Sequence, residues 1–170
     1  YSSILKMENP VQKYAADTDS FYDFTRLMTA IMAALGEGYA LHKQDIFVRR
    51  RFDAESDRKA FLSEAYFRYF RDREYIDSET YITITQENRK SALLSYDAKK
   101  WRDFRLKIRK VHDLLKDGGV EARFLTKAEA DVFVSRFYAM DFNDNTLSMN
   151  NIKADSEQLA MGDKVCRLYS

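Results

Sequence analysis

The 170-residue chain has the length of one globular domain with an appendage, and its 45% hydrophobic and 14% aromatic content, with five glycines and one proline, excludes a disordered chain. Its 28 Lys and Arg residues balance 27 Asp and Glu residues, which excludes a global attraction to nucleic acid or to an anionic membrane. The single cysteine, Cys166, excludes an intramolecular disulfide and a cysteine-rich zinc site, and it fits a reducing, cytoplasmic setting.

The longest apolar stretch, near residues 27–35, is interrupted by Thr29 and is too short to span a bilayer, so no membrane span is expected.

Residues 1–8 alternate in polarity and end before Asn9-Pro10, which predicts an edge or near-edge strand. Apolar residues at helical spacing then predict a core-facing helix that Gly36 ends. These residues are Phe21, Phe24, Met28, Ile31 and Leu35, and the candidate caps are Asp17, Asp19 and Ser20.

Residues 39–51 predict a second strand, but positions 42–45 place four polar groups in the middle of its pattern. We expect a bulge or a functional edge there. The stretch over 58–71 predicts a helix with unusually many aromatic rings, inserted between the second and third strands. Residues 81–85 alternate β-branched and aromatic side chains without a break and give the clearest strand signal in the chain.

The second half predicts two more helices and two more strands. Asp97 can cap a helix that Gly118-Gly119 ends, and residues 120–125 form a short strand. The sequence Thr126-Lys127-Ala128-Glu129 is a capping box for the next helix, which runs through Tyr138. The helix that Asp97 caps has an apolar stripe of Trp101, Phe104, Ile108, Val111 and Leu115. The final predicted strand passes through Val165, Cys166 and Leu168.

This order of elements predicts an α+β fold. Setting the inserted helix aside, two βαβ units with right-handed crossovers give a ferredoxin-like split βαβ sheet with helices on one face. We assign this domain to residues 1–140. Residues 141–170 are expected to be a connecting segment followed by the first strand of the next domain.

The motifs of the common catalytic and metal sites are missing from the sequence. A glycine-rich loop ending in Lys and Ser or Thr does not occur, and Gly36-Glu37-Gly38 follows a helix instead of opening one. His42 and His112 have no cysteine nearby and are interpreted as structural. The segment 141–152 begins like a calcium loop but lacks the glycine and the glutamate that such a loop requires. We therefore predict no catalytic, cofactor-binding or metal-binding residue, and a small hydrolase would need an acid, base and nucleophile cluster that is not displayed.

Three surfaces are candidates for binding. Arg49, Arg50 and Arg51 could contact phosphates, but neighbouring acidic residues favour a salt-bridged face. The cations of the helix over 98–117 predict a charged outer face, with protein docking and nucleic-acid binding as alternatives. The helix over 58–71 has more rings than one side can bury, so some are expected at an interface, and core packing is the favoured interpretation for most of them.

Polar side chains that interrupt a strand pattern cost sheet packing unless something outside the sheet contacts them. On this ground we predict an interaction surface at Lys43, Gln44 and Asp45, with Arg49 and Tyr69 as further members.

Several strings along the chain carry a resemblance to a known family. GYALHKQDIF at residues 38–47 looks like a motif of the TraG family of conjugative transposon ATPases, and the other strings also resemble the N-terminal region of that family. These are YSSILKMENPVQKY, AYFRYF, YITITQE, KKWRDFRLKIRKV and EARFLTKAEA, so that the likeness covers essentially the whole chain.

The resemblance implies a non-catalytic N-terminal docking or oligomerisation domain of a motor ATPase similar to those of type IV secretion systems, involved in DNA transfer. The hydrolytic domain, with its ATP and magnesium, would lie C-terminal to such a region, so no cofactor is expected in this fragment. Expected partners are channel proteins at the inner membrane, with self-association also open, and the expected location is cytoplasmic, peripheral at that membrane through the partners. The alternative is a stand-alone nucleic-acid-binding module, although the expected aromatic and basic sheet signature is weak.

Overall fold

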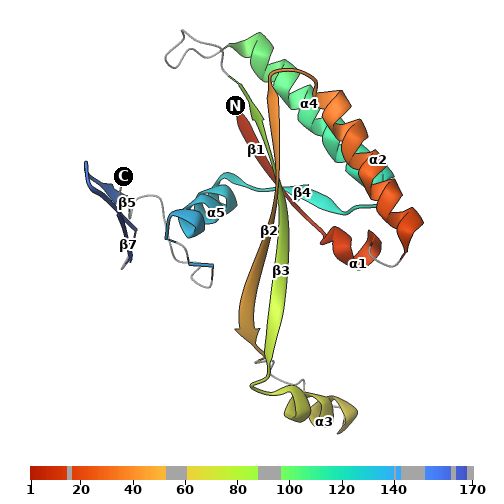
Figure 1. Ribbon diagram of the computed structural model, residues 1–170, viewed down its shortest axis with the longest axis vertical. Helices are drawn as coiled ribbons and strands as arrows, with labels where there is room; N and C mark the ends of the chain where they lie inside the picture. Colours follow the sequence, from red (N-terminus) through yellow and green to blue (C-terminus); the bar gives the residue numbers. More distant parts are fainter. Residues whose placement is uncertain are drawn as a thin grey trace.

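The computed structural model describes residues 1–14, 17–52, 61–87, 97–139, 141–142, 152–161 and 164–167. They form an α+β fold with two antiparallel sheets, a larger one that carries the helices and a smaller one near the C-terminus (Figure 1). The predicted fold class is therefore confirmed.

The larger sheet has the strand order β2-β3-β1-β4, and each neighbouring pair is antiparallel. Its strands are β1 (Ser2–Met7), β2 (Tyr39–Arg51), β3 (Glu74–Gln86) and β4 (Ala122–Phe124). The connections from β1 to β2 and from β3 to β4 each pass over one intervening strand, which is the arrangement of a split βαβ sheet. The first strand lies one position from the edge, beside the short strand β4, as its alternating pattern predicts.

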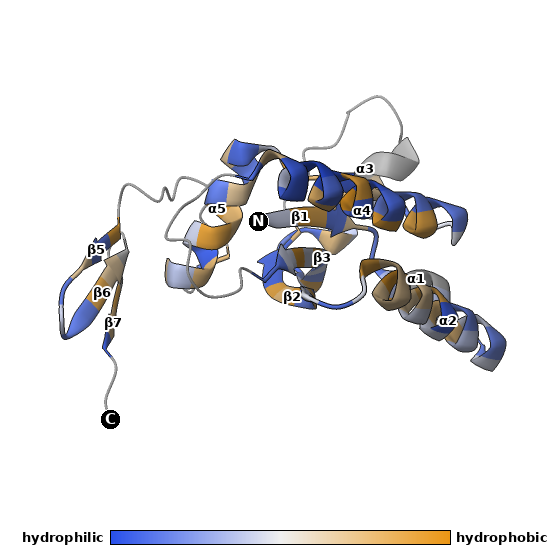
Figure 2. Cartoon of the chain, turned by 90° about the horizontal axis from the view of Figure 1, so that it is seen from above, coloured by the Kyte–Doolittle hydropathy of each residue, from blue (hydrophilic) through white to orange (hydrophobic). Residues whose placement is uncertain are grey.

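The two crossover helices, α2 (Thr18–Leu35) and α4 (Ala98–Asp117), cover one face of this sheet, and α1 (Pro10–Tyr14) precedes α2 (Figure 2). Of the three candidate caps of α2, Asp17 is the cap, since Ser20 N donates to Asp17 Oδ1 at 2.7 Å. Asp97 caps α4 as predicted, since Lys99 N donates to Asp97 Oδ1 at 2.9 Å. Gly36 ends α2 with a φ of 68°, a backbone conformation that glycine adopts without strain. The core beneath these helices consists of Leu5, Met7, Tyr14, Ile31, Leu35, Ile82, Ile84, Phe104, Ile108, Val111, Leu115 and Val120.

Helix α5 (Lys127–Ala139) packs against the opposite face of the sheet. The prediction of helices on one face thus holds for the two crossover helices and does not extend to α5. The reason is the alternation of the strands, because Ile46, Val48 and Tyr81 point away from α2 and α4 and need a second cover. Phe133 of α5 supplies it, with its ring centroid 4.5 Å from that of Tyr81.

Strands β2 and β3 pair over their full length of 13 residues, from Tyr39 opposite Gln86 to Arg51 opposite Glu74. The register is continuous, so the predicted bulge at residues 42–45 is wrong. Beyond the helices the hairpin continues as an arm and ends in α3 (Phe61–Phe70), the inserted helix that the sequence predicts (Figure 1). We use the term arm for residues 49–52 and 61–76.

The smaller sheet has the order β5-β6-β7 and is antiparallel. Its strands are β5 (Ile152–Ala154), β6 (Gln158–Met161) and β7 (Lys164–Arg167). The predicted final strand is present at Val165 and Cys166, while Leu168 lies outside the described residues. The sequence analysis missed β5 and β6, and the assignment of residues 141–170 to a following domain remains a prediction.

Candidate docking surface

The predicted interaction residues on β2 lie on both faces of the sheet. Lys43 and Asp45 lie on the face that α2 and α4 cover, and their side chains form an ion pair. Thr80, which is only 1% exposed, donates its hydroxyl to Asp45 Oδ1 at 2.8 Å. Burial by itself would raise the pKa of Asp45, but the hydrogen bonds from Lys43 and Thr80 and the charge of Lys43 lower it overall.

Gln44 lies on the opposite face, where Thr83 donates its hydroxyl to Gln44 Oε1 at 3.1 Å. Gln44 and Asp45 therefore have partners on β3, and Lys43 pairs with Asp45 on its own strand. An outside contact is not needed to explain them, which removes the physical reason for which we singled them out. Their role in binding remains a prediction.

The arginines at the end of β2 are paired with acids, as the sequence analysis favoured. Arg50 Nε lies 2.9 Å from Asp77 Oδ2, and Arg49 and Arg51 lie 3.6 and 3.7 Å from the carboxylate of Glu74. The partners come from the facing strand β3. The acids that follow the arginines along the chain, Asp53, Glu55 and Asp57, lie outside the described residues. Cross-strand pairing thus makes this a salt-bridged surface.

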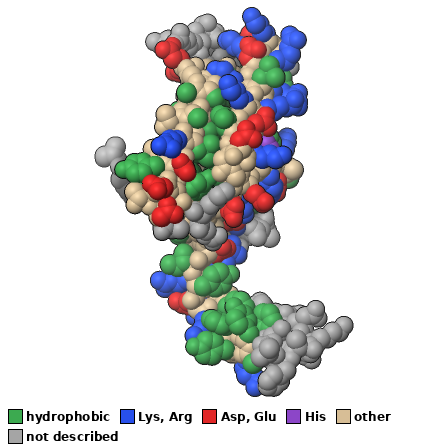
Figure 3. All heavy atoms as spheres, turned by 90° about the vertical axis from the view of Figure 1, so that its right-hand side faces the viewer, with side chains coloured by type: hydrophobic (Ala, Val, Ile, Leu, Met, Phe, Trp, Pro, Cys, Tyr) green, Lys and Arg blue, Asp and Glu red, His purple; other side chains and the backbone are tan. Residues whose placement is uncertain are grey.

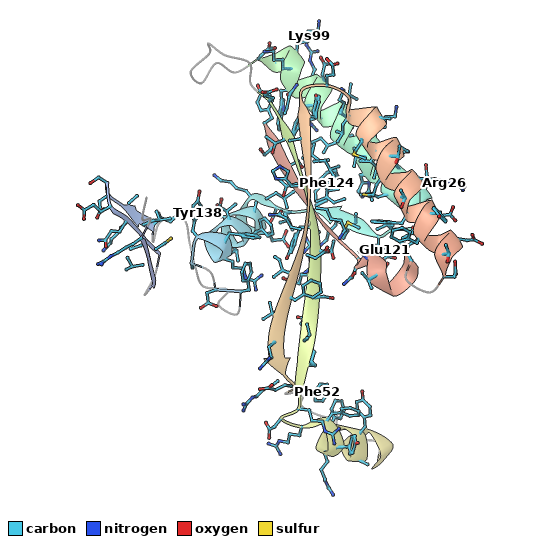
Figure 4. The ribbon with its side chains drawn as sticks, viewed as in Figure 1. Arg26, Phe52, Lys99, Glu121, Phe124 and Tyr138 are labelled. Carbon is cyan, nitrogen blue, oxygen red and sulfur yellow. The ribbon has the colours of Figure 1, made fainter. Side chains whose placement is uncertain are left out.

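Tyr69 belongs to a cluster of rings at the end of the arm, which we call the aromatic tip. It consists of Phe52, Tyr66, Phe67, Tyr69 and Phe70 (Figure 4). Phe52 lies at its centre, with ring centroids 6.4 Å from Tyr66, 5.9 Å from Phe67 and 6.2 Å from Phe70.

Arg73 closes one side of the aromatic tip, since its guanidinium carbon lies 3.8 Å from the ring centroid of Tyr69. The rings hold one another in place, but two remain open to solvent: Tyr66 is 54% exposed and Tyr69 is 60% exposed. Figure 3 shows hydrophobic side chains gathered at this end of the molecule. Large apolar surface that monomers leave exposed in one patch is a mark of interaction sites.

The aromatic tip is separate from both hydrophobic cores of the larger sheet, because none of its residues packs among the residues of either core. The arm also leaves Ile76 70% exposed and Tyr75 45% exposed. The expectation that some rings of this helix lie at a surface is supported, and the favoured interpretation, core packing in the domain for most of them, is wrong for the described rings. The members that the sequence analysis missed are Phe52 and Arg73, which lie outside the predicted helix.

Lys6, Glu79, Tyr81 and Arg136 form a second polar cluster, beneath α5. Lys6 Nζ donates to Glu79 Oε1 at 2.6 Å, and Tyr81 and Arg136 donate to Glu79 Oε2 at 3.2 and 3.4 Å. Burial alone would raise the pKa of Glu79, but the hydrogen bond and charge of Lys6, with Tyr81 and Arg136, lower it. Burial and the charge of Glu79 raise the pKa of Tyr81 to about 12.

This cluster fixes α5 on the sheet. Arg136, on α5, is 7% exposed and also donates from Nη2 to the carbonyl of Phe142 at 2.8 Å. A buried cation that lacked these partners would be costly, so the network is structural in origin. Nothing in the sequence pattern predicted it, since Lys6, Glu79 and Arg136 are far apart along the chain.

The two histidines behave differently. His112 shares a 2.9 Å hydrogen bond with the carbonyl of Ala122 and stacks on Phe124, which confirms its structural interpretation, whereas His42 is exposed on β2. Among the residues that the structure describes, no three His, Cys, Asp or Glu side chains come together in a group that could hold a metal ion. The described helices include none that is both long enough and apolar enough to cross a lipid bilayer.

Comparison of the chain with protein-family models, with curated proteins and with solved structures gave no match.

Proposed function

We propose that this chain is a non-catalytic docking domain of a conjugative-transfer ATPase similar to the TraG family, and that it binds its partner through the aromatic tip of the arm. The observation that carries the proposal is the placement of the tip. Five aromatic rings lie at the end of a hairpin that leaves its own domain, instead of in either core. Ordering such an arm costs conformational entropy, and burial of Tyr66 and Tyr69 against a partner offsets that cost.

The composition of the arm favours a protein partner. Its described cations, Arg49, Arg50, Arg51, Arg68, Arg71 and Arg73, are all arginines. Protein interfaces are enriched in Tyr, Phe and Arg and depleted in Lys, because arginine stacks on rings and is weakly hydrated. The contact of Arg73 with Tyr69 is of this kind. Residues of these types also dominate the energetics of measured interfaces.

The resemblance of the sequence supplies the setting of the proposal. In this setting the partners are channel proteins of a type IV secretion system at the inner membrane, and the domain is cytoplasmic and reaches that membrane through them. ATP and magnesium would bind in a motor domain that follows, so this chain works by contact and has no turnover of its own. Purified chain that hydrolysed ATP above a buffer control would contradict this part of the proposal.

Co-precipitation tests the docking surface. The tagged chain is co-expressed with each inner-membrane channel subunit of its conjugative system, in its normal form and with Tyr66→Ala and Tyr69→Ala together. Truncation of residues at an interface centre removes about 2 kcal/mol or more of binding free energy, which lowers affinity at least about 30-fold. Recovery of the partner by the double variant should therefore fall to background. The matched control is Tyr138→Ala, since Tyr138 is 47% exposed but lies on α5, away from the arm (Figure 4).

If the tip variant recovers as much channel subunit as the unchanged chain, the aromatic tip is not the docking surface. The nucleic-acid alternative has its own readout, which is titration of labelled single-stranded DNA at two salt concentrations. Sheet-type binding of single strands uses an open sheet face with exposed rings. Here α5 covers Tyr81 on one face and α2 and α4 cover the other, so we expect no binding.

A further inference from the structure

Strand β2 lies at the edge of the larger sheet, and β3 is its one strand neighbour among the described residues. Exposed edges are ordinarily protected by short length, charged side chains, proline, a bulge or a covering segment. Of these devices β2 carries charges, at Lys43 and Asp45, which pair with each other. Strand β2 is 13 residues long, contains no proline or glycine, and pairs with β3 without a bulge. Its outer row of backbone donors and acceptors is therefore ready to pair with another strand.

We propose that β2 pairs antiparallel with β2 of a second copy of the chain, about a twofold axis at Gln44. The inference rests on the sequence of the strand and the face on which each side chain lies. It does not depend on the proposed docking function, which uses the aromatic tip. Pairing of the two copies would join their four-stranded sheets into one continuous sheet.

The charges of β2 are self-complementary in this register. With Gln44 opposite its own copy, Lys43 of each copy lies opposite Asp45 of the other. The two residues already form an ion pair within one chain, so a dimer would place two cations and two anions in one ring. Shifting the axis by one residue in either direction places Lys43 opposite Lys43, or Asp45 opposite Asp45, and like charges directly opposite destabilise a sheet. The charges thus select one register.

The apolar residues of β2 match in the same register. On the face of α2 and α4, Phe47 lies opposite Leu41 of the other copy, and Phe47 is 66% exposed in the single chain. Since directly opposed residues of antiparallel strands project to the same face, this pairing would cover Phe47. On the face of α5, Val48 lies opposite Ala40. At the ends of the pairing, Arg49 would lie opposite Tyr39, a cation beside a ring.

Disulfide capture tests both the contact and its register. In a Cys166→Ser background, the chain carries either Gln44→Cys or the matched His42→Cys on the same strand and face. The two copies of residue 44 would have Cα atoms about 5 Å apart, within the reach of a disulfide. The two copies of residue 42 would be offset by four residues, about 13 Å, which is beyond that reach. We expect oxidation to convert Gln44→Cys to a covalent dimer and to leave His42→Cys monomeric.

Charge reversal tests the pairing without a covalent bond. Sedimentation of the 170-residue chain over a concentration series should give twice the monomer mass, with Lys43→Glu and Asp45→Lys each raising the dissociation constant at least about tenfold. An equimolar mixture of the two variants restores opposite charges across the axis and should dimerise as the unchanged chain does. Circular dichroism verifies folding of both variants, because Asp45 also accepts from Thr80.

A chain that sediments as a monomer up to several hundred micromolar overturns the proposal. Equal crosslinking of the two cysteine variants, or crosslinking of His42→Cys alone, also overturns it. The aromatic-tip variant should dimerise normally, so loss of docking and loss of dimerisation are separate results.

Discussion

The hydroxyl of Thr80, which is almost fully buried, donates to the Asp45 carboxylate across the β2 and β3 pair at 2.8 Å. A buried donor that loses its acceptor costs about 1 to 3 kcal/mol of unfolding free energy. Asp45→Ala should therefore destabilise the chain by about that amount in urea denaturation. Thr80→Val removes the donor and keeps the shape, so it should cost less. The unfolding free energy of the double variant should be close to that of Thr80→Val alone. If the losses of the two single variants were additive, the two side chains would not be coupled.

A second prediction concerns Glu79 and acid. Its pKa lies below the ordinary value of 4.5 in the folded chain, because Lys6, Tyr81 and Arg136 favour the carboxylate over the opposing effect of burial. The stability that it contributes is fully present above that ordinary value and is lost as the pH falls through the folded pKa. Glu79→Gln should lower the unfolding free energy by about 1 to 3 kcal/mol at pH 7.

The difference between Glu79→Gln and the unchanged chain should shrink as the pH falls below 4.5, when thermal or urea unfolding is followed at several values of pH. The exposed Glu121→Gln is the control and should have little effect. A difference that stayed constant from pH 7 to pH 3 would contradict the assigned role of the Glu79 carboxylate.

The arm should be dispensable for folding. Arg50 and Tyr75 are opposite each other, so residues 51–74 can be replaced by a two-residue Asn-Gly turn that closes the hairpin. Both core clusters remain intact in this variant, since none of their residues lies in the replaced segment. Thermal unfolding by circular dichroism should shift by only a few degrees. Failure of the shortened chain to fold would show that the aromatic tip stabilises the domain.

Gly118 marks a close approach between α4 and α2. A Cβ at this position would lie 2.7 Å from Leu27 Cδ2, although its φ of −71° suits any residue. Gly118→Ala should therefore lower the unfolding free energy by about 1 kcal/mol or more through overpacking. Without the clash, a change from glycine to alanine would stabilise the chain. In a Leu27→Ala background the clash is absent and the same substitution should be neutral or stabilising. An equal cost in both backgrounds would contradict this packing account.

The N-terminal caps of the helices were predictable because capping signals are local. Asp17, Asp97 and the reciprocal pair Thr126 and Glu129 act within a few residues of the groups that they cap, so the sequence shows both members. The strand order was also predictable, since two βαβ units with right-handed crossovers leave few arrangements. The interaction surface was only partly predictable. Tyr69 does belong to an exposed cluster, but Asp45 accepts from Thr80, a partner 35 residues away that sequence spacing does not reveal.

The sequence by itself determined most of the helices and strands of the larger sheet, because propensity, capping and periodicity are set by neighbouring residues. It missed the short helix α1 and the first seven residues of β3. Only the tertiary structure decided that α5 covers the second face, that the hairpin leaves the domain as an arm, and that β2 forms an open edge. Those features depend on contacts between residues such as Lys6, Glu79 and Arg136, which are distant along the chain and meet only when the sheet is assembled.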